Sequence, residues 1–162
     1  MSIRRKILAV AGVGGVAAGM WMATPAQAEV GAMNNVGTYH NADGEVVSIL
    51  PRGLRAGDCY MAGNGTLRGN ASAIYLTKPE EGYSSFYWDM TMGTVHTYTK
   101  DLWHATYTYK NAAGATVLTV KIDGYPMSDD RVYRVRKYYI GAVRISQAAF
   151  DSIKSVDWRG DC

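Results

Sequence analysis

The sequence predicts an all-β protein, an antiparallel sandwich or a partly closed barrel, with one short C-terminal helix. The chain is rich in Tyr, Thr and Val and holds only 4 Pro, a composition typical of strands. Short runs alternate between apolar and polar residues. Turn-forming pairs such as Asp43-Gly44 and Asp123-Gly124 separate many of these runs.

The alternation sets the position of each expected strand along the chain. The expected strands cover residues 36–41, 45–50, 57–62, 72–77, 83–92, 94–99, 102–110, 115–122, 131–139 and 141–145.

Residues 1–28 have the layout of a cleavable export signal. A basic triplet, Arg4 to Lys6, precedes an uncharged apolar stretch, and the small residues Ala26 and Ala28 place the cleavage just before Glu29. The apolar stretch is short and glycine-rich for a membrane span. We therefore expect a secreted protein with no stable membrane anchor after cleavage. The arginine pair leaves both the general and the twin-arginine export routes open.

Removal of the signal changes the charge balance of the chain. The whole chain has 17 Lys and Arg against 14 Asp and Glu, and the signal holds three of the basic residues and no acidic one. The mature part therefore carries equal numbers of basic and acidic side chains. A neutral exported domain argues against nucleic acid as its partner.

The only two cysteines, Cys59 and Cys162, both lie after the signal. An exported chain meets an oxidising environment, so an even pair predicts one disulfide. A closed loop of about 100 residues stabilises a fold by roughly 4–5 kcal/mol in the chain-entropy model. A free or intermolecular thiol is the alternative interpretation.

The mature part divides into two stretches. Residues 29–55 are interpreted as an N-terminal arm and hairpin, with a loose arm over 29–36 and a turn at Asn41 to Gly44. Residues 56–162 are expected to form a β-rich domain closed by the disulfide.

Residues 83–92 show a two-faced alternation. One face would hold the apolar members Phe86, Trp88, Met90 and Met92. The other would hold Tyr83, Ser85, Tyr87 and Asp89. The apolar face is expected to join the core. Exposed Tyr or Trp rings elsewhere would offer a platform for a sugar ring or a peptide.

Residues 102–122 are expected to form a hairpin around a turn at Asn111 to Gly114. If Lys110 faces Ala115, Tyr107 lies opposite Leu118, and apolar and polar residues segregate to opposite faces as a half-buried sheet requires. A glycine bulge at Gly114 would shift the register by one residue and mix the faces. The pattern favours the first register, and the turn chemistry allows the second.

The one concentration of charge lies in residues 131–139. Alternation puts Arg134, Arg136 and Tyr138 on one side, and Tyr133, Lys137 and Tyr139 on the other. Charges on both sides favour an edge strand, where Lys and Arg oppose edge-to-edge pairing. The same six residues are a candidate binding patch for an anionic partner such as a cell-wall polymer, lipid headgroups or an acidic protein.

Ser146 is expected to cap a short amphipathic helix over residues 147–154. Phe150 and Ile153 would form its apolar stripe against the sheet. Further on, Arg159-Gly160-Asp161 spells an integrin-binding tripeptide, a match expected by chance, and we expect a tight turn there.

No recognisable catalytic or metal-binding motif occurs in the sequence. The histidines His40, His96 and His104 lack metal-ligand spacing, and a zinc site would need all three with a carboxylate such as Asp89 or Asp101. Glycoside hydrolysis uses a pair of carboxylates, and Asp89 and Asp101 would supply such a pair. The favoured interpretation is that both are ordinary acidic residues on the surface. No G-x-S-x-G marks a catalytic serine. His104 is expected on a solvent face beside Lys121. We expect no catalytic residue, metal or cofactor.

Several local patterns follow one another in a set order along residues 56–162. They are Ala56 to Cys59, Asp101 to Tyr107, Asn111 to Gly114, Phe150, Ile153 and Cys162. Together they resemble a family of small secreted actinobacterial proteins of unknown function that contain a disulfide. The stretch from Asn34 to Arg55 has no counterpart in this resemblance. The resemblance implies a secreted β domain tied by a disulfide, and it implies no activity.

These observations favour a secreted extracellular binding or interaction domain. Its partner would be a cell-wall polymer, a carbohydrate or a protein, met through exposed Tyr and Arg or Lys side chains. A secreted antibacterial toxin or a protease inhibitor is the alternative. A small hydrolase comes last, and a deep pocket around His96 or His104 with a neighbouring aspartate would favour it.

Overall fold

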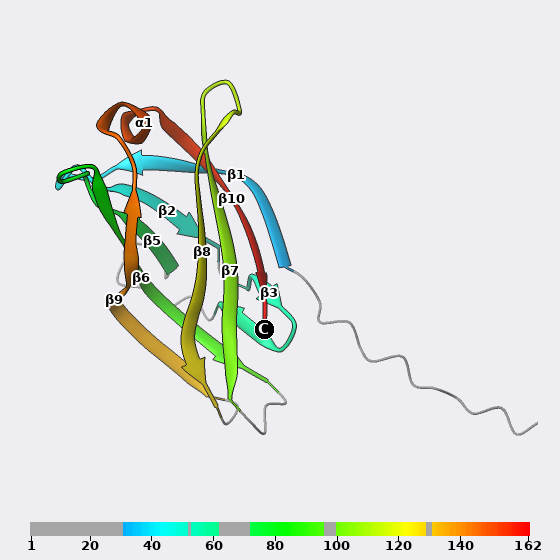
Figure 1. Ribbon diagram of the computed structural model, residues 1–162. Coiled ribbons are helices and arrows are strands. Elements are labelled where there is room, and N and C mark those ends of the chain that lie inside the picture. The colour runs from blue at the N-terminus through cyan, green and yellow to red at the C-terminus, as the bar shows by residue number, and fades with distance from the viewer. Residues whose placement is uncertain (1–30, 52, 62–71, 96–99, 129–130) are drawn as a thin grey trace, which may run out of the picture.

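The computed structural model describes residues 31–51, 53–61, 72–95, 100–128 and 131–162, and it confirms the all-β class (Figure 1). The predicted signal, its cleavage site at Ala28 and Glu29, and the strand expected over 94–99 beyond Val95 lie outside the described residues. The elements in chain order are β1 (Gly31–His40), β2 (Val46–Leu50), β3 (Arg55–Ala56), β4 (Cys59–Met61), β5 (Ser72–Leu76), β6 (Tyr83–Thr94), β7 (Asp101–Asn111), β8 (Thr116–Met127), β9 (Val132–Arg144), α1 (Gln147–Asp151) and β10 (Ile153–Asp161).

These strands form one antiparallel sheet that folds into two layers. The order is β3-β4-β6-β5-β2-β1-β10-β7-β8, and β9 pairs with the other edge of β6. The first half of β1 pairs with β10 and its second half with β2, so β1 curves from one layer into the other (Figure 1). We call β1, β10, β7 and β8 layer A, and β1 to β6 with β9 layer B. Among the described residues the sheet does not close into a barrel, which favours the sandwich of the two predicted architectures.

An ion pair and a backbone hydrogen bond fix the bend in β1. The register of β1 shifts between Met33 and Val36, where Asn35 has a φ of 55°. The backbone N–H of Asn35 donates to Asp157 of β10 over 2.8 Å, and Lys110 of β7 forms an ion pair with the same carboxylate. The Lys110 hydrogen bond, followed by that of Asn35, lowers the pKa of Asp157.

The core lies between the layers and is dominated by three tryptophans. Trp88 of β6, Trp103 of β7 and Trp158 of β10 are all fully buried. The rings of Trp103 and Trp158 lie 5.6 Å apart, and Phe86 packs on Tyr107 at 5.2 Å between centroids. The apolar face predicted for residues 83–92 therefore belongs to the core as expected.

Two of these indoles pack directly on glycines. A Cβ at Gly124 would lie 2.6 Å from the Trp88 ring and 2.7 Å from the backbone oxygen of Trp103. A Cβ at Gly160 would lie 2.3 Å from the Trp158 ring. Only glycine leaves room for an indole against the backbone at these two positions.

The hairpin of β7 and β8 keeps its predicted faces but not its predicted register. Tyr107 pairs with Val120 rather than with Leu118, so the favoured register is wrong by two residues. Lys110, next to the turn, pairs with Thr116 instead of Ala115, which is a shift of one residue. The register shifts by one further residue between Lys110 and Tyr109, so Tyr109 pairs with Leu118 instead of Thr116. Two single shifts add to an even number, so each side chain stays on its face. The buried members are Trp103, Ala105, Tyr107, Tyr109, Val120 and Ile122.

The C-terminal segment differs most from expectation. Ser146 caps α1 by accepting the backbone N–H of Ala149 over 3.2 Å, but the helix ends at Asp151. From Ile153 onward the chain forms β10, which pairs with β1 on one side and β7 on the other. The tight turn expected at residues 159–161 is therefore wrong, because these residues pair with β7 and β1. The loose arm expected over 29–36 is wrong for residues 31–36, which belong to β1, while residues 29 and 30 lie outside the described part of the chain. The two strands expected over 131–145 form the single strand β9.

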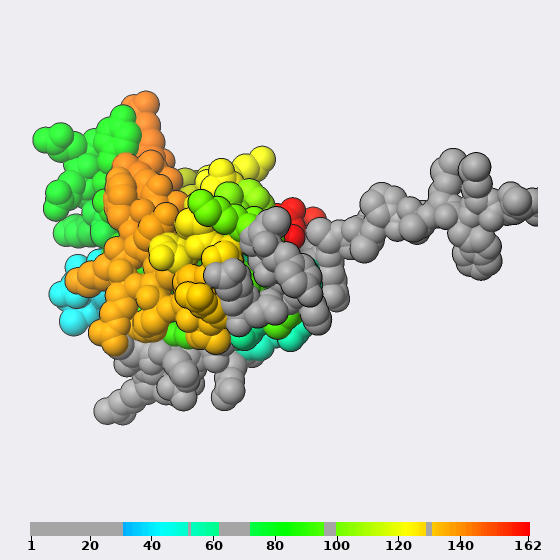
Figure 2. Space-filling view, turned by 90° about the horizontal axis from the view of Figure 1, so that it is seen from below, coloured from blue at the N-terminus to red at the C-terminus, as the bar shows by residue number. Residues whose placement is uncertain are grey.

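The predicted edge strand is confirmed in the described part of the chain, where β9 pairs with β6 alone. Two register shifts interrupt this pairing, and bulges and charges both discourage edge-to-edge association. The edges of β8 and β9 meet through Tyr125, whose ring lies 5.7 Å from Tyr133 and 5.5 Å from Tyr138. Figure 2 shows these yellow and orange segments side by side at the surface.

The predicted disulfide joins Cys59 of β4 to Cys162, just beyond β10, with 5.8 Å between their Cα atoms. It links the layer B strand β4 to the end of the layer A strand β10. No helix in the described ranges is long and apolar enough to cross a membrane.

We predict that Gly124→Ala lowers the free energy of unfolding by about 2–3 kcal/mol, because the added methyl group overpacks the Trp88 site. Gly141→Ala is the matched control, since a Cβ there meets nothing within 4 Å, and its effect should stay within about 0.5 kcal/mol. Urea denaturation of both variants measures this difference. Equal stabilities would contradict the packing role of Gly124.

Replacing both cysteines, as Cys59→Ala with Cys162→Ala, should lower the free energy of unfolding by about 3–5 kcal/mol. The bridge joins two residues that are 103 positions apart in the sequence. Its loss increases the conformational entropy of the unfolded chain, which favours unfolding. Guanidinium denaturation with and without reductant measures this effect. Reductant should destabilise the wild type and leave the variant unchanged, and a wild type indifferent to reductant would contradict the role of the bridge.

Asp157 should make stability depend on acid pH. Its pKa is lower when folded, so the carboxylate stabilises the fold above the unfolded pKa of about 3.9, and this contribution is lost as pH falls through the folded pKa. Asp157→Asn should therefore cost up to about 1 kcal/mol at pH 6, limited by solvent screening, and almost nothing near pH 2. Denaturation at both pH values tests this, with Asp151→Asn on α1 as the control. A loss for Asp157→Asn that is equal at the two pH values would refute the assignment.

Candidate functional site

Four tyrosines form a row across the outer face of layer B. Tyr39 lies opposite Val47, Val47 opposite Tyr75, Tyr75 opposite Tyr87, and Tyr87 opposite Tyr139. Residues directly opposite in antiparallel strands share a face, so all five point away from the core. Val47 is fully buried although it faces outward.

The centre of the row is a stacked pair of rings. The centroids of Tyr75 and Tyr87 lie 4.6 Å apart, and the ring planes differ by 2°. This distance is close to the spacing of about 4.8 Å between neighbouring strands, so two tyrosines placed opposite one another stack without bending the sheet. Tyr39 and Tyr139 at the ends are 44% and 58% exposed, and they leave ring surface open to a ligand.

Glu45 is held beside this pair by neutral donors. The Tyr87 hydroxyl donates to the Glu45 carboxylate at 2.9 Å from each oxygen, and the Asn41 amide donates over 2.8 Å. The Asn41 side-chain oxygen in turn accepts the backbone N–H groups of Asp43 and Glu45. Burial, followed by the Glu45 hydrogen bond, raises the pKa of Tyr87, so the phenol keeps the proton that it donates. Among the described residues no basic side chain forms an ion pair with Glu45.

Asp89 and Lys137 lie on the opposite side of the stacked pair from Glu45. Asp89 forms an ion pair with Arg134 of β9. Opposite Asp89 the strand β9 contains an extra residue, because Trp88 pairs with Tyr138 while Met90 pairs with Val135. Lys137 sits in this bulge with a φ of 44°, a strained conformation for a residue with a side chain.

Together these side chains line a groove of about 240 Å³. Its lining consists of Asn41, Asp43, Glu45, Tyr75, Tyr87, Asp89 and Lys137. A second hollow of about 340 Å³ shares Asp43 and Glu45 and extends toward Tyr83. The groove is rich in hydrogen-bond acceptors and has an aromatic centre, so it suits a ligand that carries many donors.

The structure divides the predicted patch on residues 133–139 between two faces. Tyr133 and Tyr138 pack against the core, whereas Tyr139 is exposed and Arg136 and Lys137 are exposed beside it. The predicted side assignment is therefore wrong beyond Val135, because the bulge adds a residue and reverses the alternation.

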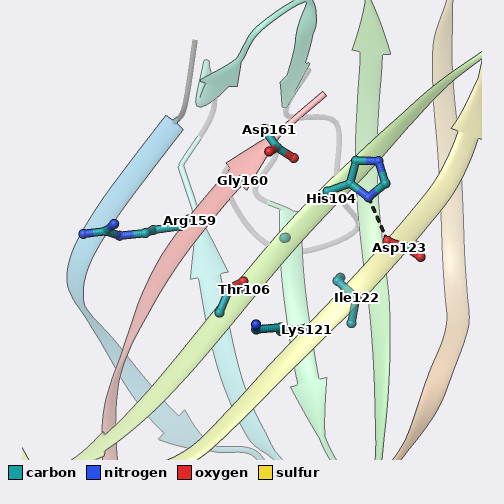
Figure 3. Close-up of a pocket in the computed structure, with 9 residues that line it drawn as sticks. His104, Thr106, Lys121, Ile122, Asp123, Arg159, Gly160 and Asp161 are labelled. Carbon is teal, nitrogen blue, oxygen red and sulfur yellow. Dashed lines mark hydrogen bonds and ion pairs between the residues drawn. The ribbon is translucent and has the colours of Figure 1, made fainter. Parts of the chain in front are cut away.

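A depression of about 360 Å³ lies on the outer face of layer A. Nδ1 of His104 contacts the Asp123 carboxylate at 2.7 Å there, and Lys121 lies opposite Thr106 rather than opposite His104 (Figure 3). The side chains of His104 and Asp123 are 50% and 79% exposed. Catalytic triads bury the aspartate that orients the histidine, so this open pair lacks the setting that favours a hydrolase.

The other candidate residues are spread over the molecule. Asp89 lies on the outer face of β6 with Arg134, whereas Asp101 lies beside the disulfide, so the two carboxylates do not form a pair. In the described part of the chain, the one close group of three potential metal ligands is Cys59, Asp101 and Cys162, and the disulfide consumes its two sulfurs. His40 packs against Phe150, and His96 lies outside the described residues.

Sequence reasoning placed Tyr87 and Asp89 on an outer face but did not bring Tyr39, Tyr75 and Glu45 to them. The short strand at residues 72–77 alternates, so Tyr75 on its outer face had a local signal. The order of the strands had no local signal in the sequence. The neighbours β2 and β5, for example, pair across a long stretch of intervening chain.

Comparison of the chain with protein-family models, with curated proteins and with solved structures found no match.

Proposed function

We propose that this protein is a secreted extracellular binding domain that holds a carbohydrate in the groove over Tyr75 and Tyr87. The observation that carries this proposal is the stacked tyrosine pair set between the carboxylates of Glu45 and Asp89. Aromatic rings contact the C–H surface of a sugar, and carboxylates accept hydrogen bonds from its hydroxyl groups. The groove offers both chemistries within one hollow.

The groove is largely fixed before a ligand arrives. Tyr75 and Tyr87 hold one another by stacking, and Glu45 is held by Tyr87 and Asn41. Side chains that are already ordered lose little conformational entropy on binding. Tyrosine also gives a large contact area with few rotatable bonds.

The length of the row suits a polymer rather than a single sugar. The row from Tyr39 to Tyr139 crosses four strand spacings, about 19 Å in all. A sugar ring with its linkage occupies about the length of one strand spacing, so several units fit along the row. A cell-wall polysaccharide is the ligand class that combines this length with an extracellular location.

Export is supported by two independent features. Residues 1–28 have the layout of a signal, and the Cys59–Cys162 bridge is of the kind that forms in oxidising compartments.

Mature protein, residues 29–162, should sediment with insoluble cell-wall polysaccharide and bind its soluble oligosaccharides in calorimetry. Tyr75→Ala and Tyr87→Ala should each weaken binding at least about tenfold, because each removes half of the aromatic centre. Glu45→Gln should weaken it less, since the amide keeps an acceptor. Leu102→Ala, an exposed apolar position on layer A, is the control and should bind as the wild type does.

Absence of wild-type binding to every polysaccharide and oligosaccharide tested would overturn the proposal. Unchanged binding by both tyrosine variants would overturn the assignment to this groove.

A further inference from the structure

The outer face of layer A carries charged residues in rows across three strands. In the first row Asp161 of β10 lies opposite His104 of β7, which lies opposite Asp123 of β8. In the second row Arg159 lies opposite Thr106, which lies opposite Lys121. Neighbouring rows are two residues apart along each strand, about 7 Å. An acidic row therefore borders a basic one.

Only part of this charge is neutralised within the surface. His104 and Asp123 contact one another, and in the row beyond the basic one Asp157 pairs with Lys110. Within the described ranges no ion-pair partner is found for Arg159, Lys121 or Asp161. Arg159 also acts on the Asp157 carboxylate, whose pKa it helps Lys110 to lower. Lys121 and Asp161 are thus the two charges left to face a ligand.

The same residues surround a hollow of about 360 Å³, in which the short side chain of Thr106 lies between longer neighbours. Figure 3 shows Thr106 and Lys121 side by side on adjacent strands, His104 above Asp123, and Arg159 extending from β10 toward β1. Arg159, Lys121 and Asp161 are all exposed, so their charged ends are accessible.

We infer that this depression binds a small ligand carrying an oxyanion and an amine, with the oxyanion over Thr106 and Lys121 and the amine toward Asp161. The Lys121 ammonium and the Thr106 hydroxyl donate to the oxyanion from neighbouring strands, while Arg159 at the rim extends toward β1. Charge-assisted hydrogen bonds of this kind are the stronger class. The Asp161 carboxylate lies one row away, at the separation that a short linker between phosphate and amine spans.

His104 and Asp123 complete the rim of the depression. Of the remaining charged groups on these three strands, Asp157 and Lys110 form an ion pair with one another. Asp101 lies beside the disulfide, and Lys154 lies at the opposite end of β10. This inference does not depend on the groove of layer B.

O-Phosphoethanolamine is the probe, with inorganic phosphate and ethanolamine as its two halves. Titrations use backbone-amide chemical shifts in mature protein at constant ionic strength, with sodium chloride as the salt control. We expect saturable shifts at Thr106, Lys121 and Gly160, with O-phosphoethanolamine binding about threefold tighter than inorganic phosphate, as one screened charge contact gives. Ethanolamine alone should bind more weakly than either.

Variants separate the two halves of the site. Lys121→Gln should weaken both phosphate ligands about tenfold, and Asp161→Asn should remove the advantage of O-phosphoethanolamine while leaving phosphate bound. Lys154→Ala, an exposed lysine at the opposite end of β10, is the matched control and should change neither affinity. Shifts that do not saturate, equal affinity for the two phosphate ligands, or unchanged binding by Lys121→Gln would each overturn the inference.

Discussion

Close packing of indoles against glycine backbone is the constraint on which the rest of this fold depends. Trp88 occupies the space that a side chain at Gly124 would need, and Trp158 does the same at Gly160. These contacts join β6 of layer B to β8 of layer A and seat the indole of β10 against its own strand. They set how closely the layers approach, and they fix which faces of β6, β8 and β10 turn inward.

The outer surfaces follow from this inner packing. Because side chains alternate along a strand, fixing the inner set of residues also fixes the outer set. On layer B the result is a row of tyrosines whose central pair lies between two carboxylates, and on layer A it is a pair of rows of opposite charge. The stacked tyrosines and the rows of layer A lie on strands, which hold side chains more firmly than loops do.

β9 shows how a single extra residue changes a surface. Simple alternation would keep Tyr138 with Arg134, but the bulge opposite Asp89 sends Tyr138 into the core beside Trp88 and leaves Lys137 strained in the groove. Bulges of this kind are common at sheet edges and beside functional sites, where they redirect a side chain. A patch of aromatic and basic residues that looks uniform in sequence is thereby split into a structural part and an exposed part.

The sequence by itself determined what depends on neighbours along the chain. The strand class, the two faces of residues 83–92, the Ser146 cap and the pairing of Cys59 with Cys162 follow from alternation, local hydrogen bonding and the presence of just two cysteines. Tertiary structure decided what depends on pairing between distant segments. It decided that residues 31–36 belong to a central strand rather than to a loose arm, and that residues 159–161 continue a central strand rather than form a turn. It also brought Tyr39, Tyr75 and Glu45 to Tyr87, and Asp161 to His104. The physical reason is that a strand is stabilised by its partners, and local sequence does not say which partners those are.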